Sequence, residues 1–348
     1  MQSEVKEEVC DFDNLYKAMR HCRKEVMWKD SVAGYVKNGL VNVHKLKESL
    51  EDGTYKIDRY TEFKVYEPKE RDIVSTRIKD RVFQRSLCDH YFYDAMSNSF
   101  IYDNCACQIG KGNDFARDRL KVHLLKYFRE HKNNGYVLKA DLTNYFGSTP
   151  HELAYNSVTK RCSDEWCNNH VHTIISSFTQ GNDPSIGMGL GSETTQLIEL
   201  AVLDDLDHFI KEQLHIRHYL RYMDDLVLIH EDKEYLKSCL EQIRDWVESR
   251  GLRLSSKKTQ LFPLQQGIKF LGFRFRLSDT GKVVMTLLPE KVSHERRKLR
   301  KLVARSRAGW MSREEVDNCY KAWKAHAKKG NCHTLILSMD KYYTNLWR

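Results

Sequence analysis

HYLRYMDDLVLIH, at residues 218–230, holds two apolar runs around an acidic pair. Aromatic and β-branched residues enrich both runs, which predicts two strands joined by a tight turn at Met223-Asp224. Asp224 and Asp225 could be solvated turn residues with no further role. Their apolar flanks weigh against that interpretation, because burying unpaired carboxylates is costly and favours a bound cation.

The sequence on both sides of this hairpin continues the pattern. Residues 136–142 follow Gly135, are β-rich and predict a buried strand that ends near Asp141. Helical patterns fill 151–178, 193–212 and 233–250, and strand-like pieces occupy 259–262 and 268–276. From 136 to 262 the order is β, α, α, β-turn-β, α, β, which is close to a split βαβ, ferredoxin-like layout.

In such a sheet the end of the first strand can lie beside the turn of the central hairpin. That would bring Asp141 next to Asp224 and Asp225. Three carboxylates from two strands make a hard, oxygen-rich site of the kind that takes Mg²⁺. Two such ions about 3.5–4 Å apart can stabilise both the attacking and the leaving oxygen in phosphoryl transfer.

The charge of the chain is unevenly distributed. The 348 residues include 57 Lys+Arg and 48 Asp+Glu, a formal net charge of +9. Residues 289–348 hold 15 Lys+Arg and 6 Asp+Glu, so this unit alone accounts for the excess of +9. A neutral body with a cationic helical unit suggests a clamp for a polyanion. A solvated basic helix is the alternative.

The composition is that of a globular protein rather than a disordered or collagen-like one. No apolar run approaches about 18 residues, and the acidic start does not resemble a signal peptide. A cytoplasmic location without membrane contact is therefore expected. The 10 cysteines include no CxxC and are expected to be free thiols. A zinc site at Cys162, Cys167, His170 and His172 is the alternative, although the spacing fits no common site.

Eight segments, in order, resemble the motifs of reverse transcriptases. They are YEPKERDI (66–73), IKDRVFQRSL (78–87), DNCACQIGKG (103–112), KADLTNYFGSTPH (139–151), GMGLGSETTQLIELAVLDDLD (187–207), RYMDDLVLIH (221–230), LRLSSKKTQLFP (252–263) and GIKFLGFRF (267–275). The resemblance implies an α+β fold of the right-hand polymerase type, with fingers, a ferredoxin-like palm and an α-helical thumb. The implied parts are an N-terminal helical extension (1–55), fingers (56–135), palm (136–284) and a basic helical thumb (285–348).

The resemblance also implies the roles of individual residues. Asp141, Asp224, Asp225 and the backbone carbonyl of Leu142 match ligands of two Mg²⁺ ions, for which Mn²⁺ is a substitute. Lys258 matches a lysine that protonates the leaving pyrophosphate. The residues that match nucleotide contacts are Lys69 and Arg71 on the triphosphate, Phe146 against the sugar 2′ position, and Leu190, Gly191 and Gln196. Phe270, Leu271 and Gly272 match the primer grip.

The form LGSETTQ (190–196) resembles bacterial enzymes of diversity-generating retroelements more than the Q-G-x-x-x-S-P form of intron, retron and retroviral enzymes. That subgroup implies error-prone copying of a template RNA into cDNA from dNTPs, with a small basic helical accessory protein as partner. Leu190 would replace a glutamine that contacts the nucleotide in accurate relatives. A phage-defence or retron-type enzyme that copies a dedicated non-coding RNA is the alternative.

Two other classes of function were weighed. A catalytically inactive, RNA-binding palm usually lacks one of the acids, and all three are present here. An RNA-directed RNA polymerase usually has G-D-D and a polar residue where Phe146 stands. Both features favour a DNA polymerase.

Overall fold

The computed structural model describes residues 4–66, 70–178, 183–189 and 191–348. Four N-terminal helices come first, where the sequence predicted a helical segment: α1 (Glu4–Cys10), α2 (Phe12–Cys22), α3 (Asp30–Lys37) and α4 (Gly39–Glu51). Leu15 and Met19 are buried on one face of α2, which packs on α5 (Ile78–Leu87). Asp11 begins α2 by accepting a hydrogen bond from the backbone N–H of Asn14 at 3.0 Å.

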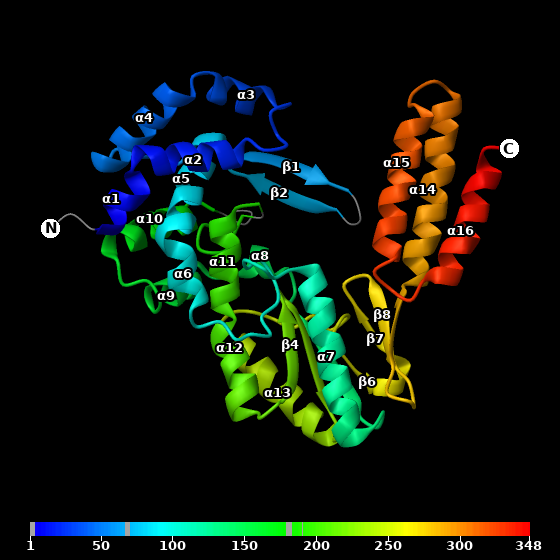
Figure 1. The fold of residues 1–348 in the computed structure, drawn as a ribbon. Helices are drawn as coiled ribbons and strands as arrows, with labels where there is room; N and C mark the ends of the chain where they lie inside the picture. Colours follow the sequence, from blue (N-terminus) through cyan, green and yellow to red (C-terminus); the bar gives the residue numbers. More distant parts are fainter. Residues whose placement is uncertain (1–3, 67–69, 179–182, 190) are drawn as a thin grey trace.

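An antiparallel hairpin, β1 (Thr61–Val65) and β2 (Arg71–Ser75), precedes α5. The chain then continues through η1 (Cys88–Phe92) and α6 (Tyr93–Ser97) to the long helix α7 (Asn113–His131). In Figure 1 the β1–β2 hairpin extends from the N-terminal helices over the centre of the molecule.

The central sheet has four strands in the order β4-β5-β3-β6, and every neighbouring pair is antiparallel. They are β3 (Tyr136–Asp141), β4 (His218–Tyr222), β5 (Asp225–His230) and β6 (Gln260–Pro263). This is the strand order of a ferredoxin-like sheet, as the sequence predicted.

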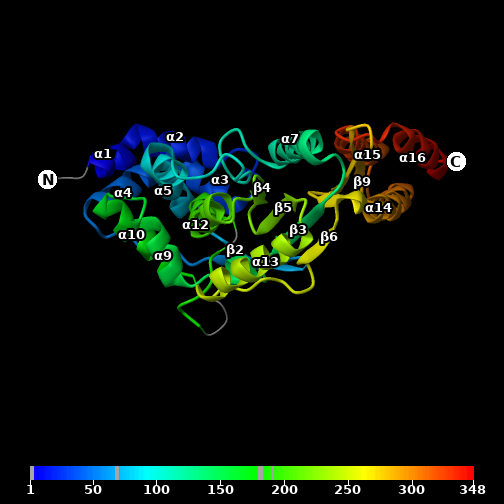
Figure 2. The same ribbon diagram turned by 90° about the horizontal axis from the view of Figure 1, so that it is seen from below.

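Side-chain alternation along the strands of the central sheet divides the core around it into two clusters, one on each face. Val137 of β3 packs with α7, whereas its neighbour Leu138 packs in the cluster that contains α13 (Lys233–Glu248). The helices between β3 and β4 complete the second cluster: α8 (Tyr145–Ser148), α9 (His151–Thr159), α10 (Glu165–Ser176), α11 (Glu193–Val202), α12 (Asp204–His208) and η2 (Phe209–Gln213). Figure 2 shows α7 and α13 on opposite faces of the sheet.

A second, three-stranded sheet follows a short helix, η3 (Leu264–Gln266). Its strands are β7 (Ile268–Phe270), β8 (Phe273–Leu277) and β9 (Val283–Leu287). The strand β9 was not predicted from the sequence, which had placed strand-like pieces only as far as residue 276.

The C-terminal segment is helical, as predicted, and forms α14 (Pro289–Arg307), α15 (Arg313–Ala327) and α16 (His333–Leu346). Pro289 stands in the first turn of α14, where a missing N–H costs little. Ser312 and Glu315 form a capping box that begins α15.

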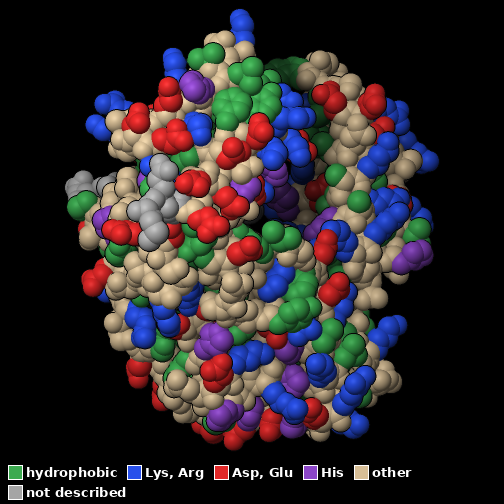
Figure 3. All heavy atoms as spheres, turned by 60° about the vertical axis from the view of Figure 1, so that its left-hand side comes forward, with side chains coloured by type: hydrophobic (Ala, Val, Ile, Leu, Met, Phe, Trp, Pro, Cys, Tyr) green, Lys and Arg blue, Asp and Glu red, His purple; other side chains and the backbone are tan. Residues whose placement is uncertain are grey.

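The molecule has two raised ends above the central sheet. The N-terminal helices with the β1–β2 hairpin form one end, and α14, α15 and α16 form the other, across the sheet (Figure 1). The space-filling view shows a hollow between the two ends, with Lys and Arg side chains along its rim (Figure 3). Among the described helices, none has the length and apolar character needed to cross a membrane.

Candidate active site

The structure brings the three predicted acids to one end of the central sheet. Asp141, the last residue of β3, is the pairing partner of Asp225, the first residue of β5. Asp224 lies in the two-residue turn between Tyr222 and Asp225, which are themselves paired. Met223, the first turn residue, has a φ of 52°, in the left-handed region that side-chain-bearing residues seldom adopt. The tight turn predicted at Met223-Asp224 is therefore present.

Asp225 is a partly buried acid with an incomplete set of hydrogen-bond partners. Its Oδ2 atom lies 3.0 Å from Lys139 Nζ. Its Oδ1 atom is buried and has no hydrogen-bond partner. Burial raises the pKa of Asp225 to about 6, Asp141 and Asp224 add to the rise, and Lys139 opposes it.

Asp141 is paired with a second lysine. Lys258 Nζ lies 2.5 Å from Asp141 Oδ1. The loop that carries Lys258 is held against the end of β3, because Ser255 donates its backbone N–H to Asp141 O at 2.7 Å. Leu142 continues this contact through an isolated antiparallel bridge to Leu254. The loop thus presents Lys258 to the acidic cluster.

The described residues contain no group of three or more His, Cys, Asp or Glu side chains already arranged to hold a metal ion. The same holds for Cys162, Cys167, His170 and His172. In the acidic cluster, Lys139 and Lys258 occupy carboxylate oxygens that a metal ion would take.

The acidic cluster nevertheless suits a divalent cation in its donor chemistry. All its donors are oxygens, which favours hard ions such as Mg²⁺ and Mn²⁺. The Oδ1 atom of Asp225 has no hydrogen-bond partner, and the charges of Asp141 and Asp224 contribute to the raised pKa of Asp225. A bound cation would stabilise the ionised form of these acids. The residues that would hold the ion are Asp141, Asp224 and Asp225.

Phe146 lies in the short helix α8, directly after the acidic end of β3. Its backbone carbonyl accepts a hydrogen bond from Met188 N at 2.6 Å. The ring is partly buried and packs edge-on against Tyr145, with ring centroids 5.8 Å apart. Phe146 is therefore tied to the segment that leads into Gly191.

A cavity of about 700 Å³ lies between the N-terminal helices, α5 and the start of α11. Gly191 and Gln196, both predicted to lie near the nucleotide, line it. The φ of Gly191 is 122°, which a residue with a side chain would adopt only under strain. Lys69 and Leu190 lie outside the described residues, as does the side chain of Arg71, whose backbone pairs with Val65 in the β1–β2 hairpin.

The three residues predicted as a primer grip stand at a tight hairpin turn. Phe270 ends β7 and is buried, whereas Leu271 and Gly272 form the turn to β8 with φ values of 44° and 85°. Arg117 of α7 donates to Leu271 O at 3.4 Å. The turn is thereby fastened to α7.

Sequence analysis missed three features near the acids. Lys139 was not named, although it lies two residues before Asp141 and so shares its face of β3. Glu199 is fully buried in α11. Arg221 of β4 is also fully buried and forms an ion pair with Asp207 of α12.

The fold and the acids together define a class of protein. An antiparallel sheet with paired acids at one end, between a helical lobe and a group of cationic helices, is typical of right-hand polymerases. The chain belongs to the reverse transcriptase (RNA-dependent DNA polymerase) family, whose model matches residues 69–275, more than half of the chain. The family predicted from the sequence motifs is thus confirmed.

Two further comparisons were made. Among solved structures, apo telomerase from Candida tropicalis is similar with a TM-score of 0.48 and 12% sequence identity. The match covers 65% of this chain and 47% of the telomerase chain, so this chain spans about half the length of that one. No match was found among curated proteins.

Proposed function

We propose that this reverse transcriptase joins deoxynucleotides to a primer on an RNA template by a two-metal mechanism at Asp141, Asp224 and Asp225. The observation that carries the proposal is the pairing of Asp141 with Asp225 across β3 and β5, with Asp224 in the adjoining turn. In this proposal the fingers are residues 56–135, the palm is residues 136–284 with the central sheet, and the thumb is residues 285–348 with α14 to α16.

Each residue of the site has a distinct task in this mechanism. Divalent cations, when bound by the carboxylates, supply charge neutralisation for the attacking and leaving oxygens. Lys139 of β3 forms an ion pair with Asp225 and opposes the rise in the pKa of that acid. Lys258 holds a proton on Nζ beside Asp141, from where it can pass to the leaving pyrophosphate.

Biologically, we propose that the chain copies a template RNA with errors, as in a diversity-generating retroelement. The support is the form of the segment LGSETTQ (190–196), in which an apolar residue replaces an amide. An apolar contact recognises shape but does not enforce hydrogen-bond geometry, so mispairs are penalised less.

The test compares wild type with Asp224→Asn and Asp225→Asn in dNTP incorporation on an RNA template with a DNA primer and Mg²⁺. Both variants should lose activity by orders of magnitude and still melt cooperatively, because each exchange keeps side-chain volume. Asp245→Asn, an exposed acid on α13, is the matched control and should keep full activity. Extension at the wild-type rate by either variant would contradict the assignment. Sequencing of the wild-type product tests the subgroup, for which errors should gather opposite template adenines.

A further inference from the structure

A buried ion pair lies beneath the acidic turn. Arg221 of β4 and Asp207 of α12 are both fully buried. The guanidinium donates from Nε to Asp207 Oδ1 at 2.8 Å and from Nη2 to Asp207 Oδ2 at 2.7 Å. Tyr219 also donates its hydroxyl to Asp207 Oδ1, at 2.5 Å. Such a pair is weak evidence for stability, because desolvation of both charges offsets their attraction.

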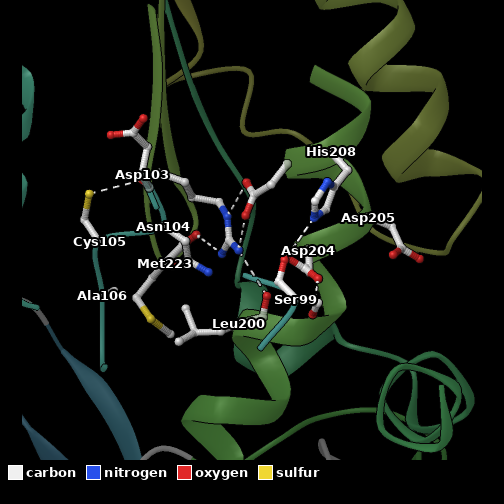
Figure 4. Close-up of polar contacts among 12 residues, drawn as sticks. Ser99, Asp103, Asn104, Cys105, Ala106, Leu200, Asp204, Asp205, His208 and Met223 are labelled. Atoms are coloured by element: carbon white, nitrogen blue, oxygen red, sulfur yellow. Dashed lines mark hydrogen bonds and ion pairs between the residues drawn. The ribbon is translucent and has the colours of Figure 1, made fainter. Parts of the chain in front are cut away.

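The remaining guanidinium contacts join two backbone segments. Nη2 also donates to Leu200 O in the last turn of α11, at 3.0 Å. Nη1 donates to Met223 O, in the turn between β4 and β5, at 3.0 Å. In Figure 4 some of the dashed lines reach the labelled residues Leu200 and Met223 from a guanidinium that lies between them. Arg221 thus connects the catalytic turn to α11 and α12.

The backbone of Arg221 is itself fixed. Its N–H donates to Asp103 O at 3.0 Å, and its carbonyl accepts from Cys105 N at 2.9 Å. The segment that follows α6 therefore runs alongside β4 at this residue. Because backbone and side chain are both held, the guanidinium has a defined position from which to act on the turn.

The orientation of the Met223 carbonyl affects the position of Asp224. The carbonyl belongs to the peptide unit that leads into Asp224, so its orientation determines where the Asp224 side chain begins. Met223 has a φ of 52°, and strained backbone of this kind persists only where its surroundings fix it. The hydrogen bond from Arg221 Nη1 is a contact that fixes it.

We propose that Arg221 is a positioning residue, oriented by Asp207, that sets the Met223-Asp224 turn so that Asp224 faces the cation shared with Asp141 and Asp225. Arg221 touches no reacting atom. The inference rests on the proposed function, since it assigns a task toward the same cation-binding acids.

The test uses the double variant Arg221→Met, Asp207→Leu in the full-length protein. Exchanging both charges for apolar side chains leaves no unpaired ion and is often tolerated by the fold. The matched control is the double variant Arg161→Met, Asp204→Leu. It removes another buried ion pair, in which Arg161 Nη2 lies 2.7 Å from Oδ2 of Asp204 at the start of α12. Arg161 and Asp204 bond to Ser99, Ser157 and Asp205, away from the acidic turn.

Three quantities are measured: the melting temperature, Mn²⁺ affinity by electron paramagnetic resonance of the free ion, and kcat with KM for a dNTP. The Arg221 double variant should bind Mn²⁺ more weakly and have a lower kcat, each by about 10- to 100-fold, as for other residues that orient metal ligands. KM and the melting temperature should change little. The control should match wild type in Mn²⁺ affinity and kcat.

Equal Mn²⁺ affinity and kcat in the two double variants would overturn the inference. If the Arg221 double variant does not fold, the single variant Arg221→Lys tests the inference instead. Lysine keeps the positive charge beside Asp207 but lacks the guanidinium nitrogen that donates to the Met223 carbonyl. Unchanged Mn²⁺ affinity in Arg221→Lys would likewise overturn it. A wild type that binds Mn²⁺ without making DNA would sink the proposed function alone, since the comparison of affinities still decides the role of Arg221.

Discussion

Glu199 is a buried carboxyl behind the acidic cluster, and its burial favours the protonated form. Burial raises its pKa to about 8, the charge of Asp224 adds to the rise, and hydrogen bonds from Tyr145 and Thr149 oppose it. Thr149 Oγ1 lies 2.9 Å from Tyr145 O and 3.0 Å from Glu199 Oε2. The Thr149 hydroxyl shares its one hydrogen between these two oxygens, and the buried Oε1 atom of Glu199 has no hydrogen-bond partner, so a negative charge on Glu199 is poorly stabilised.

Replacing Glu199 by Gln should change the pH dependence of stability. The folded-state pKa of about 8 lies above the ordinary value of 4.5, so the stability from protonated Glu199 is full below the ordinary value and declines as pH rises toward 8. Gln does not titrate. Between about pH 5 and pH 8 the free energy of unfolding of Glu199→Gln should therefore rise relative to wild type, by a few kcal/mol at most.

Urea unfolding at several pH values measures this difference. Glu241→Gln, an exposed position on α13, is the control and should show no such trend. A constant offset between Glu199→Gln and wild type at every pH would mean that folding does not raise the pKa of Glu199.

At the scale of elements, the site is formed where α8 meets α11. Asn144 precedes α8 with a φ of 45° and turns the chain away from β3. The Tyr145 hydroxyl donates to Glu199 O at 2.6 Å, which fastens α8 to α11. Phe146 follows in α8, and its carbonyl is bound by Met188 N. These two hydrogen bonds therefore fix the backbone that carries the ring.

Phe146→Ala tests whether this ring selects the sugar. If Phe146 crowds the 2′ position, kcat/KM for GTP should rise far more than the value for dGTP, which should fall modestly with lost packing. If the ring is only core, both values should fall together as the fold weakens, since Phe→Ala in a core costs about 3–5 kcal/mol.

Single-nucleotide insertion with dGTP and GTP gives the ratio, and a melting curve gives the stability. Phe128→Ala removes a partly buried ring from α7 and is the matched control. An unchanged dGTP/GTP ratio in Phe146→Ala would exclude a role for this ring in sugar choice.

Local patterns sufficed for those parts of the site that depend on neighbours in sequence. Alternation in residues 218–230 gave the hairpin, and the order of elements placed Asp141 beside it. The position of Lys139 could have been predicted in the same way, because side chains two residues apart in a strand lie on the same face, here that of Asp141. The ion pair of Arg221 with Asp207 could not be predicted from local sequence, because Asp207 lies on α12 and only tertiary packing brings it to β4.

At the scale of the whole molecule, the C-terminal helices both carry the excess positive charge and pack against the second sheet. Their residues carry the whole excess of +9. Ala327 and Ile336 also pack with Phe273 and Met285 of the second sheet. Deleting these helices would expose that core, so the role of their charge is better tested by substitution than by truncation.

Arg297, Arg300 and Lys301 are exposed on α14, and changing all three to Gln should flatten the salt dependence of binding to an RNA–DNA hybrid. The slope of log affinity against log salt should fall by roughly 0.9 for each phosphate contact removed, the value known for B-form duplexes. Fluorescence anisotropy at several salt concentrations measures it. The control changes Lys233, Lys237 and Arg244 on α13 to Gln. Equal slopes in both triple variants would mean that α14 is merely solvated.

The two lysines in the acidic cluster affect how the protein folds. Lys139 and Lys258 already neutralise Asp225 and Asp141, at 3.0 Å and 2.5 Å. The newly synthesised chain can therefore close its central sheet without waiting for an ion, unlike small domains whose folding requires a metal. In the proposed mechanism a metal ion would displace these ammonium groups after folding, so a chelator should abolish DNA synthesis without unfolding the protein.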